Sequence, residues 1–481
     1  MAGNPDTKHP LYVDREGEWK LMRDSARGET AIKASGEEYL PIPSGFNLSP
    51  QKTKLYEAYQ ARAQFPEIVA PTVQEMVGII HSREIRIDLP DAMVDLWEAA
   101  TPDGLPLEAF HRRITGEILE TGRYGVLVGA ASTGSDLPYL VGYGTEAIIN
   151  WSDDKDFYVL DESGYVRDGF EWSEQKKYRV LELVGGTYEV ITYTGENFTQ
   201  GDPVEPAARG GERLKTIPFE VAGPRDLSQD PETPPLIGVA RAAKAIYQLS
   251  ADYRWQMYMS GQETLFVMNA DAPEAVGAGV VVGLKAEKGS DGTAPNVDAK
   301  YVGPSGTGMA AHKTAIDDEK RNAAAAGARM FNTGGQERSQ ESGEARRMRF
   351  AAETASLTSV AQSSCALLEK SLRNVGRMMG LTDAVIDSIV VYPPKDLIDR
   401  RLAPEEVDRI MSLVEKGFMS FETAYESLQE GEWASAERTW EEERELIDSE
   451  DIGSGTTDAE RAALAPPPGN EADPEDIPAA A

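Results

Sequence analysis

The chain is long and strongly acidic. Its 481 residues are more than one compact core usually holds, so we expect two or more packed units and a tail. With 81 Asp and Glu against 48 Lys and Arg, the formal net charge is -33, which disfavours tight static binding to phosphate backbones. The single cysteine, Cys365, excludes an intramolecular disulfide and a cysteine-built metal site. Without a signal-peptide core or a run of ~20 apolar residues, we expect a soluble protein of a reducing cytosol that enters no membrane.

The first 90 residues predict an arm, two helices and a strand. Residues 1–50 mix charges, Gly and Pro without sustained periodicity, which indicates an irregular arm. The segment "LYEAYQARAQF" predicts a helix, and a second helix opens at Pro71 because apolar residues follow at helical spacing. In "REIRIDL" apolar and polar residues alternate, which predicts a strand that ends at Pro90.

The stretch "EAFHRRITGEILETGRYGVLVGA", Glu108 to Ala130, joins a helix to a buried strand. One apolar stripe runs along the helix, Gly122 suits a left-handed C-cap, and Tyr124 to Val128 have the composition of a short buried strand. His111 stands next to two arginines, which places it on a solvated helix face. We interpret the passage as a structural joint between a helix and a buried strand.

The middle of the chain predicts β structure followed by two helices. From Pro138 to about Val221 the pattern is that of strands, with a hairpin around Gly185-Gly186. The helix "LIGVARAAKAIYQLSADYRWQMYMSG" has a face of small residues that lets another helix approach closely, so we expect this helix to pack against neighbouring elements along much of its length. A Gly-rich stretch of short strands and loops follows, and then an alanine-rich helix up to Phe331.

The last third predicts one very long helix and an acidic end. After the polar break "NTGGQERSQESG", apolar residues recur at helical spacing up to Met379, which indicates a helix of more than about 30 residues. A strand in "SIVVYP" and two short helices follow. The run from Glu432 to Asp451 has nine acids and two bases and is expected to be helical at most in part, and the remaining tail has a disordered composition.

The residue types that usually carry catalysis do not group in the sequence. The four histidines, His9, His81, His111 and His312, are too scattered for a histidine-based metal site. The stretch "GPSGTGMAAHKT" lacks the Gly-Lys-Ser/Thr ending of a phosphate-binding loop. Cys365 lies on an apolar helical stripe and is expected to be structural. We therefore expect no enzyme activity, no cofactor and no metal.

Several segments between about Tyr39 and Leu381 are distinctive: "YLPIP", "LYEAYQARAQFPEIVAPTVQEMVGIIHSREIRIDLP", "FHRRITGEILETGRYGVLV", "IPFEVAG" and "ESGEARRMRFAAETASLTSVAQSSCALLEKSL". Together with the order of the predicted parts, they resemble the portal proteins of tailed bacteriophages, the rings through which DNA enters and leaves the capsid. The chain departs from that family in the arm, the Gly-rich insert and the tail. The resemblance implies an α+β, portal-type fold with a mixed α/β wing, a helical stem, a β-rich clip, a long wing helix and a helical crown.

The resemblance also implies a division of the chain. In order, it assigns an N-terminal arm (1–50), wing (51–235), first stem helix (236–261), clip (262–305), second stem helix (306–331), tunnel loop (332–343), long wing helix (344–380), wing strand return (381–400), crown helices (401–450) and disordered acidic tail (451–481). The channel wall would be mainly acidic, with isolated basic points toward DNA at Lys313, Lys320, Arg321 and Arg338. The tunnel-loop residues would be Gly334, Gly335, Gln336, Glu337, Arg338 and Ser339.

By the same resemblance, the protein would act in the virion, at the portal vertex, after assembly in the bacterial host cytoplasm. The implied partners are further copies in a ring, typically of twelve, the terminase large subunit, a head-tail adaptor, the major capsid and scaffolding proteins, and double-stranded DNA in the channel. Twelve copies at -33 each would carry roughly -400 charges, so assembly is expected to weaken at very low ionic strength. The small-residue helix faces are candidates for the contact between copies. Two alternatives remain: another virion structural protein, such as a head-tail adaptor or capsid protein, and a metal-dependent nuclease or hydrolase.

Overall fold

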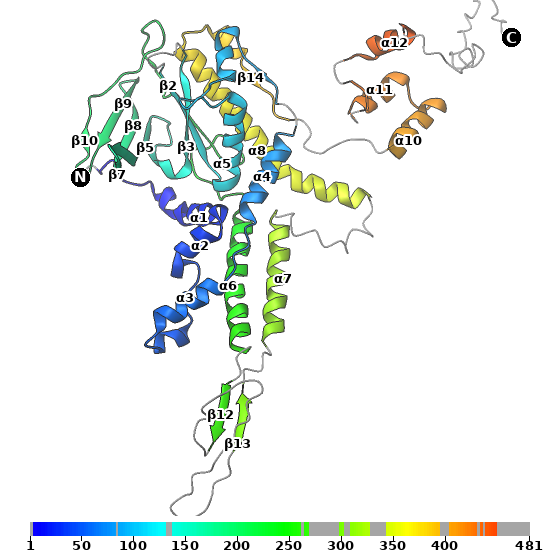
Figure 1. Ribbon diagram of the computed structural model, residues 1–481. Coiled ribbons are helices and arrows are strands. Elements are labelled where there is room, and N and C mark those ends of the chain that lie inside the picture. The colour runs from blue at the N-terminus through cyan, green and yellow to red at the C-terminus, as the bar shows by residue number, and fades with distance from the viewer. Residues whose placement is uncertain are drawn as a thin grey trace, which may run out of the picture. The chain divides into compact units, whose positions relative to one another are not determined.

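The structure is a computed structural model of the chain. It describes residues 3–82, 85–130, 137–260, 264–268, 298–302, 308–327, 343–394, 404–430, 433–435 and 438–449. The fold is a mixture of helices and strands, as the sequence predicts (Figure 1). Two units divide the chain, Met1–Leu397 and Ile398–Ala481. The expected tunnel-loop residues 332–342, most of the expected clip and the tail 451–481 lie outside the described residues.

The N-terminal segment is helical, so the expectation of an irregular arm is wrong. Helix α1 (Pro10–Arg27) starts with proline at its first turn, and the His9 side chain accepts a hydrogen bond from the backbone N–H of Leu11. Trp19 and Met22 are fully buried on α1, so this helix belongs to the core. Short helical segments follow: α2 (Glu29–Ala34), η1 (Gly36–Glu38) and η2 (Ser44–Leu48).

The predicted helix-to-strand joint is confirmed. Helix α5 (Leu107–Thr121) ends at Gly122, which has φ 75° and donates its backbone N–H to the Ile118 carbonyl oxygen at 2.9 Å. The chain then enters β2, which lies in the centre of a three-stranded sheet of order β11-β2-β3. The elements around this joint are α3 (Lys52–Arg62), α4 (Val69–Ile80), η3 (Asp91–Trp97), β2 (Tyr124–Gly129), β3 (Tyr139–Gly144), η4 (Thr145–Ala147) and β11 (Phe219–Ala222).

A second, antiparallel sheet has the order β10-β9-β8-β5-β4. The predicted hairpin joins β8 to β9, and both turn residues have positive φ, 61° at Gly185 and 81° at Gly186, which glycine adopts readily. A separate two-stranded sheet is formed by β6 and β7. The strands are β4 (Ile148–Trp151), β5 (Phe157–Asp161), β6 (Gly164–Asp168), β7 (Glu171–Gln175), β8 (Lys177–Val184), β9 (Thr187–Thr194) and β10 (Thr199–Gln200).

Helix α8 (Gly343–Met378) is the predicted long helix and runs through the core of the first unit. Its side chains Leu367, Leu368, Leu372 and Val375 are fully buried. Beyond α9 (Asp383–Asp387), β14 (Val390–Val391) pairs antiparallel with β1 (Ile87–Asp88), with Ile87 opposite Val391. This pairing ties a late segment of the chain to the α/β elements of its first half.

The second unit contains three helices among its described residues: α10 (Pro404–Glu415), α11 (Phe421–Glu430) and α12 (Trp440–Ser449). The Trp440 ring lies 6.1 Å from the Phe421 ring and 5.6 Å from the Tyr425 ring, which joins α12 to α11. The helical character of α12 agrees with the expectation that the acidic run is partly helical. Across the described parts of both units, we find no helix with the length and apolar character to cross a membrane.

Candidate functional site: the paired helices and the surface beside them

Two helices, α6 (Ile237–Ser260) and α7 (Met309–Ala325), lie side by side and run antiparallel (Figure 1). A Cβ added at Gly238 near the start of α6 would lie 2.9 Å from Ala326, just after α7. At the other end, a Cβ at Gly308 would lie 3.0 Å from the Gln256 side chain. The small residues thus allow a close helix–helix approach. A hairpin of β12 (Thr264–Met268) and β13 (Asp298–Val302) occurs between the two helices in the chain.

The small-residue face of α6 is buried inside its own chain. Ala240, Ala243 and Tyr247 are fully buried in the core that α1, α4, α5 and α8 also build. The prediction that this face packs closely against neighbouring elements is therefore confirmed. Its use as a contact between chains is excluded, because no part of it remains exposed. Further along α6, Met257 and Met259 are 47% and 43% exposed, so the helix passes from core to surface.

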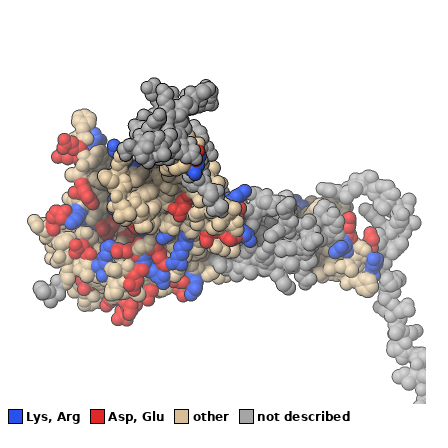
Figure 2. Space-filling model, turned by 90° about the horizontal axis from the view of Figure 1, so that it is seen from below, with Lys and Arg blue, Asp and Glu red and all other residues tan. Residues whose placement is uncertain are grey.

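The two helices are not acidic. Together they contain six Lys and Arg against four Asp and Glu, although the whole chain has a net charge of -33. Lys313 is exposed on α7. Lys320 lies 3.3 Å from Asp317, and Arg321 forms an ion pair with Asp318, so these two bases are not the isolated points that the sequence predicted. The mainly acidic channel wall stays a prediction, and α6 and α7 alone do not supply its acidic charge. On the face of the molecule that Figure 2 shows, Lys and Arg likewise lie beside Asp and Glu.

The expected loop residues Gly334, Gly335, Gln336, Glu337, Arg338 and Ser339 lie outside the described residues. Of the predicted DNA-facing residues, the structure therefore brings only Lys313, Lys320 and Arg321 onto one helix.

Sequence reasoning missed a pocket of about 370 Å³ between the end of α3 and the outer half of α6. The Arg62 guanidinium lies 3.9 Å from the centre of the Tyr258 ring and donates to the Ala58 carbonyl oxygen at 2.5 Å. Arg254 donates to the Gln64 side chain. No local motif reveals the pocket, because its two sides are about 190 residues apart in the chain. The lining residues are Glu29, Ala61, Arg62, Ala63, Gln64, Arg254 and Met257.

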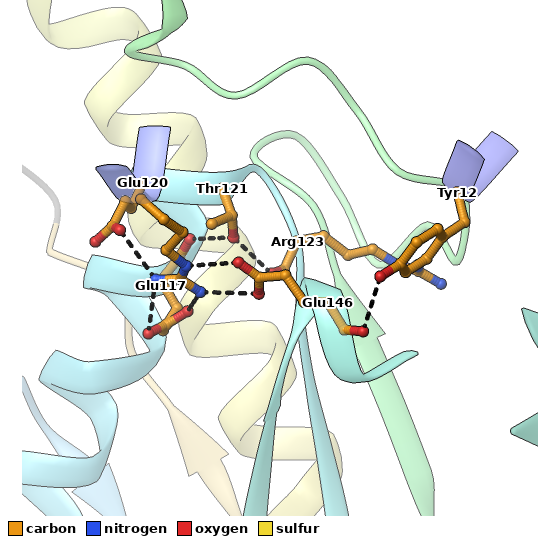
Figure 3. Close-up of polar contacts among 7 residues, drawn as sticks. Tyr12, Glu117, Glu120, Thr121, Arg123 and Glu146 are labelled. Carbon is orange, nitrogen blue, oxygen red and sulfur yellow. Dashed lines mark hydrogen bonds and ion pairs between the residues drawn. The ribbon is translucent and has the colours of Figure 1, made fainter. Parts of the chain in front are cut away.

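A polar cluster joins α1 to α5 and η4, and Figure 3 shows it in close-up. The Arg23 guanidinium lies 2.6 Å from Glu117, 3.0 Å from Glu120 and 2.7 Å from Glu146. Arg23 thus forms ion pairs with three carboxylates. Burial raises the pKa of Glu120 above its usual value, and the charge of Arg23 only partly offsets this rise. The cluster fixes the N-terminal helix against the rest of the unit.

Next to this cluster, Arg123 is a fully buried cation. Its guanidinium lies 3.9 Å from the centre of the Trp151 ring and donates through Nη1 to the Ile148 carbonyl oxygen at 3.3 Å. Within the described residues, its Nε and Nη2 atoms have no hydrogen-bond partner. Burial lowers the pKa of Arg123 to about 9. The His9 ring stacks on Trp151 at 4.1 Å, so the indole connects the N-terminal segment to the sheet.

His111 is buried, so the expectation of a solvated position is wrong. Its Nε2 atom lies 3.2 Å from the Ser364 hydroxyl and 3.8 Å from the Cys365 sulfur, because α8 covers this side of α5. The His81 ring packs edge-on against it at 4.9 Å. Burial raises the pKa of the Cys365 thiol to about 12, so this thiol stays protonated and structural. No metal-binding group of three or more His, Cys, Asp or Glu occurs among the residues that the structure describes.

Part of the chain matches a known family model. Residues 235–379, which span α6 to the end of α8, match a family described as a domain of unknown function, DUF4055. No curated protein matches the chain. Among solved structures, the chain resembles one described as "Neck of empty GTA particle computed with C6 symmetry", with 15% identity over 77% of this chain and 90% of that chain. The TM-score is 0.39, which is too low to establish a shared fold.

Proposed function

We propose that the chain is a subunit of a phage portal ring, a virion structural protein that forms a channel for packaging and ejecting double-stranded DNA. The observation that carries the proposal is the helix pair α6 and α7. Helix α6 leaves the α/β core, a hairpin follows in the chain, and α7 returns to the same core. The 36-residue α8 comes after α7. The segments between Tyr39 and Leu381 that resemble portal proteins follow the same order of parts along the chain.

In the proposed ring, copies of α6 and α7 line or support the channel. Their charges are nearly balanced, and two of the three bases on α7 are already paired with aspartates. Such a wall offers few phosphate contacts, and the affinity for DNA rises steeply with the number of such contacts. DNA would therefore slide past without strong retention, and Lys313 would supply a weak contact.

The other roles follow from the same proposal. A ring of about twelve copies would bind the terminase large subunit during packaging, since an ATPase must supply the energy for DNA movement. A head-tail adaptor would later occupy the same vertex, and the major capsid and scaffolding proteins would surround it. The chain itself is proposed to be neither an enzyme nor a cofactor-binding protein, with Arg338 of the tunnel loop as a second DNA contact.

The test is the mass and shape of the purified particle. Light scattering should give about twelve copies, and negative-stain images should show closed rings with a central hole. A single-copy species under all solution conditions, and also inside virus particles, would refute the proposal. Shells or sheets would indicate a capsid protein, and a divalent-metal-dependent activity would indicate the hydrolase alternative.

A point substitution tests the channel role separately from assembly. Lys313→Ala should leave the rings intact and alter the retention of packaged DNA. Lys320→Ala is a matched control on the same helix, because the charge of Lys320 is already paired with Asp317 at 3.3 Å. Equal DNA yields for Lys313→Ala, the control and the unmodified protein would remove Lys313 from the channel surface.

A further inference from the structure

The pocket between α3 and α6 contains two guanidinium groups whose bonding capacity is not used within the chain. Arg62 donates to a backbone carbonyl oxygen, and Arg254 donates to the Gln64 side chain, so both of these acceptors are uncharged. Within the described residues, neither arginine has a carboxylate at ion-pair distance. A guanidinium has five N–H donors in a planar arrangement, which matches the two oxygens of a carboxylate. In the part of the chain that the structure describes, both arginines therefore keep donors that are not paired with a carboxylate of their own chain.

The carboxylate already in the pocket does not fill this role. Glu29 lies 2.7 Å from the Lys33 ammonium and accepts the backbone N–H of Phe65 at 3.0 Å. Although burial opposes its ionisation, these two partners hold the pKa of Glu29 below its usual value. Arg254 acts on this carboxylate only at longer range. Glu29 is thus already bound to Lys33 in α2 and to the backbone of Phe65 after α3. The two arginines still line the pocket.

The surroundings have the composition of a protein–protein contact. Arg62 packs on the ring of Tyr258 at 3.9 Å and on that of Trp255 at 5.7 Å. Next to them, Tyr258 is 38% exposed and Met259 is 43% exposed. Tyr, Trp, Arg and Met are the residue types that are enriched where proteins bind each other. A nucleic-acid groove instead needs a longer series of Lys and Arg along the backbone path.

We propose that this pocket binds a carboxylate side chain of a second copy of the same chain. The proposal rests on the proposed ring, in which two different faces of the chain must meet at each contact. The small-residue face of α6 is buried inside the chain, so the contact has to use another surface. A second copy brings 81 Asp and Glu and thus many carboxylates that can complement the two arginines. The net charge of -33 disfavours a continuous polyanion such as DNA at the same place.

Zero-length cross-linking tests the pocket directly. Arg254→Lys places an amine in the pocket, and a carbodiimide joins an amine to a nearby carboxylate as an amide, itself becoming a urea. Rings would be assembled from equal amounts of unlabelled and nitrogen-15-labelled protein before treatment. Mass spectrometry should then find position 254 linked to an Asp or Glu with mixed isotopes, which proves a link between copies.

A matched control uses an arginine whose carboxylate lies in its own chain. Arg225 is 83% exposed and lies 3.3 Å from Glu232, so Arg225→Lys should give links within one copy only. The double variant Arg62→Gln with Arg254→Gln should raise the protein concentration needed for half-assembly by about tenfold or more, whereas Arg225→Gln should not. Unchanged circular dichroism would show that the double variant still folds.

The outcomes separate this inference from the proposed function. If the unmodified protein forms rings, but position 254 gives no mixed-isotope link and the double variant assembles normally, the inference is wrong and the ring proposal stands. If the double variant assembles normally but loses duplex DNA binding, the pocket binds phosphate and the inference is also wrong. If the unmodified protein never forms rings, both the proposed function and this inference are wrong.

Discussion

Acid should destabilise the first unit through His111. This imidazole is 2% exposed, and burial, with a smaller effect of His81, lowers its pKa from 6.5 to about 3. Below pH 6.5 the unfolded chain therefore binds a proton that the folded chain does not. The free energy of unfolding consequently falls as the pH decreases from about 6.5, and the fall from this group stops only when the folded imidazole titrates near pH 3.

The size of the effect follows from these pKa values. At pH 5 the unfolded imidazole is almost fully protonated, because this pH lies about 1.5 units below the imidazole's ordinary pKa of 6.5. Relative to pH 8, His111 alone should then remove about 2 kcal/mol from the free energy of unfolding, with a local slope of about 1.4 kcal/mol per pH unit. This is a substantial share of the ~5–15 kcal/mol by which a folded domain is usually stable.

Urea unfolding followed by circular dichroism between pH 5 and pH 8 measures this slope. His111→Gln should lose the ~2 kcal/mol contribution, so its stability should vary less with pH than that of the unmodified protein. Ser364→Ala is the matched control, because it removes the 3.2 Å hydrogen-bond partner but leaves the imidazole buried, and it should retain the slope. Parallel pH curves for His111→Gln and the unmodified protein would refute the reasoning.

Three further substitutions test the packing. Gly122→Ala should lower the free energy of unfolding by more than ~1 kcal/mol, measured by thermal unfolding. The reason is that Gly122 has φ 75° and that an added Cβ would lie 3.1 Å from a backbone carbonyl oxygen. The control Gly116→Ala, within α5, should leave the stability unchanged or raise it. Leu368→Ala should lower the free energy of unfolding by about 2–5 kcal/mol, and Leu48→Ala, at an 89% exposed position, should change it by less than ~0.5 kcal/mol. Arg123→Met should be neutral or stabilising in the same urea assay, because an apolar side chain of similar size avoids burying a cation with two unbonded donor atoms, and a loss of several kcal/mol would contradict this.

The sequence predicted those elements whose signals are local. The end of α5 at Gly122 followed from an apolar stripe, a glycine and a run of strand formers within about 25 residues. The turn between β8 and β9 followed in the same way from Gly185-Gly186 between two alternating runs. In each case the backbone requirement and the residue that meets it are neighbours in the chain.

The features that were missed depend on distant partners. Helix α1 has its apolar residues spread among many charges, and its contacts, such as Arg23 with Glu117, reach across about 94 residues. The arginines beside His111 indicated an exposed helix face, but α8 covers this histidine with residues about 253 positions later. The pocket at Arg62 and Arg254 was missed for the same reason, because its two sides are about 190 residues apart in the chain. Such contacts become visible only when the tertiary fold places the segments together.

The uneven distribution of charge gives a final test of the ring. The unit Ile398–Ala481 contains 23 Asp and Glu against 7 Lys and Arg, a net charge of -16, which is about half of the total of -33. In the proposed ring, this unit therefore contributes about half of the charge that makes copies repel each other, while α6 and α7 add no net negative charge. A chain that ends at Leu397 should assemble with a weaker dependence on salt, because each copy then carries a charge of -17 and the repulsion scales with the product of the charges. Light scattering from low to high ionic strength measures this dependence. If the truncated and full-length chains respond equally to salt, long-range repulsion does not control assembly, and short-range contacts such as the arginine pocket would have to set its salt dependence.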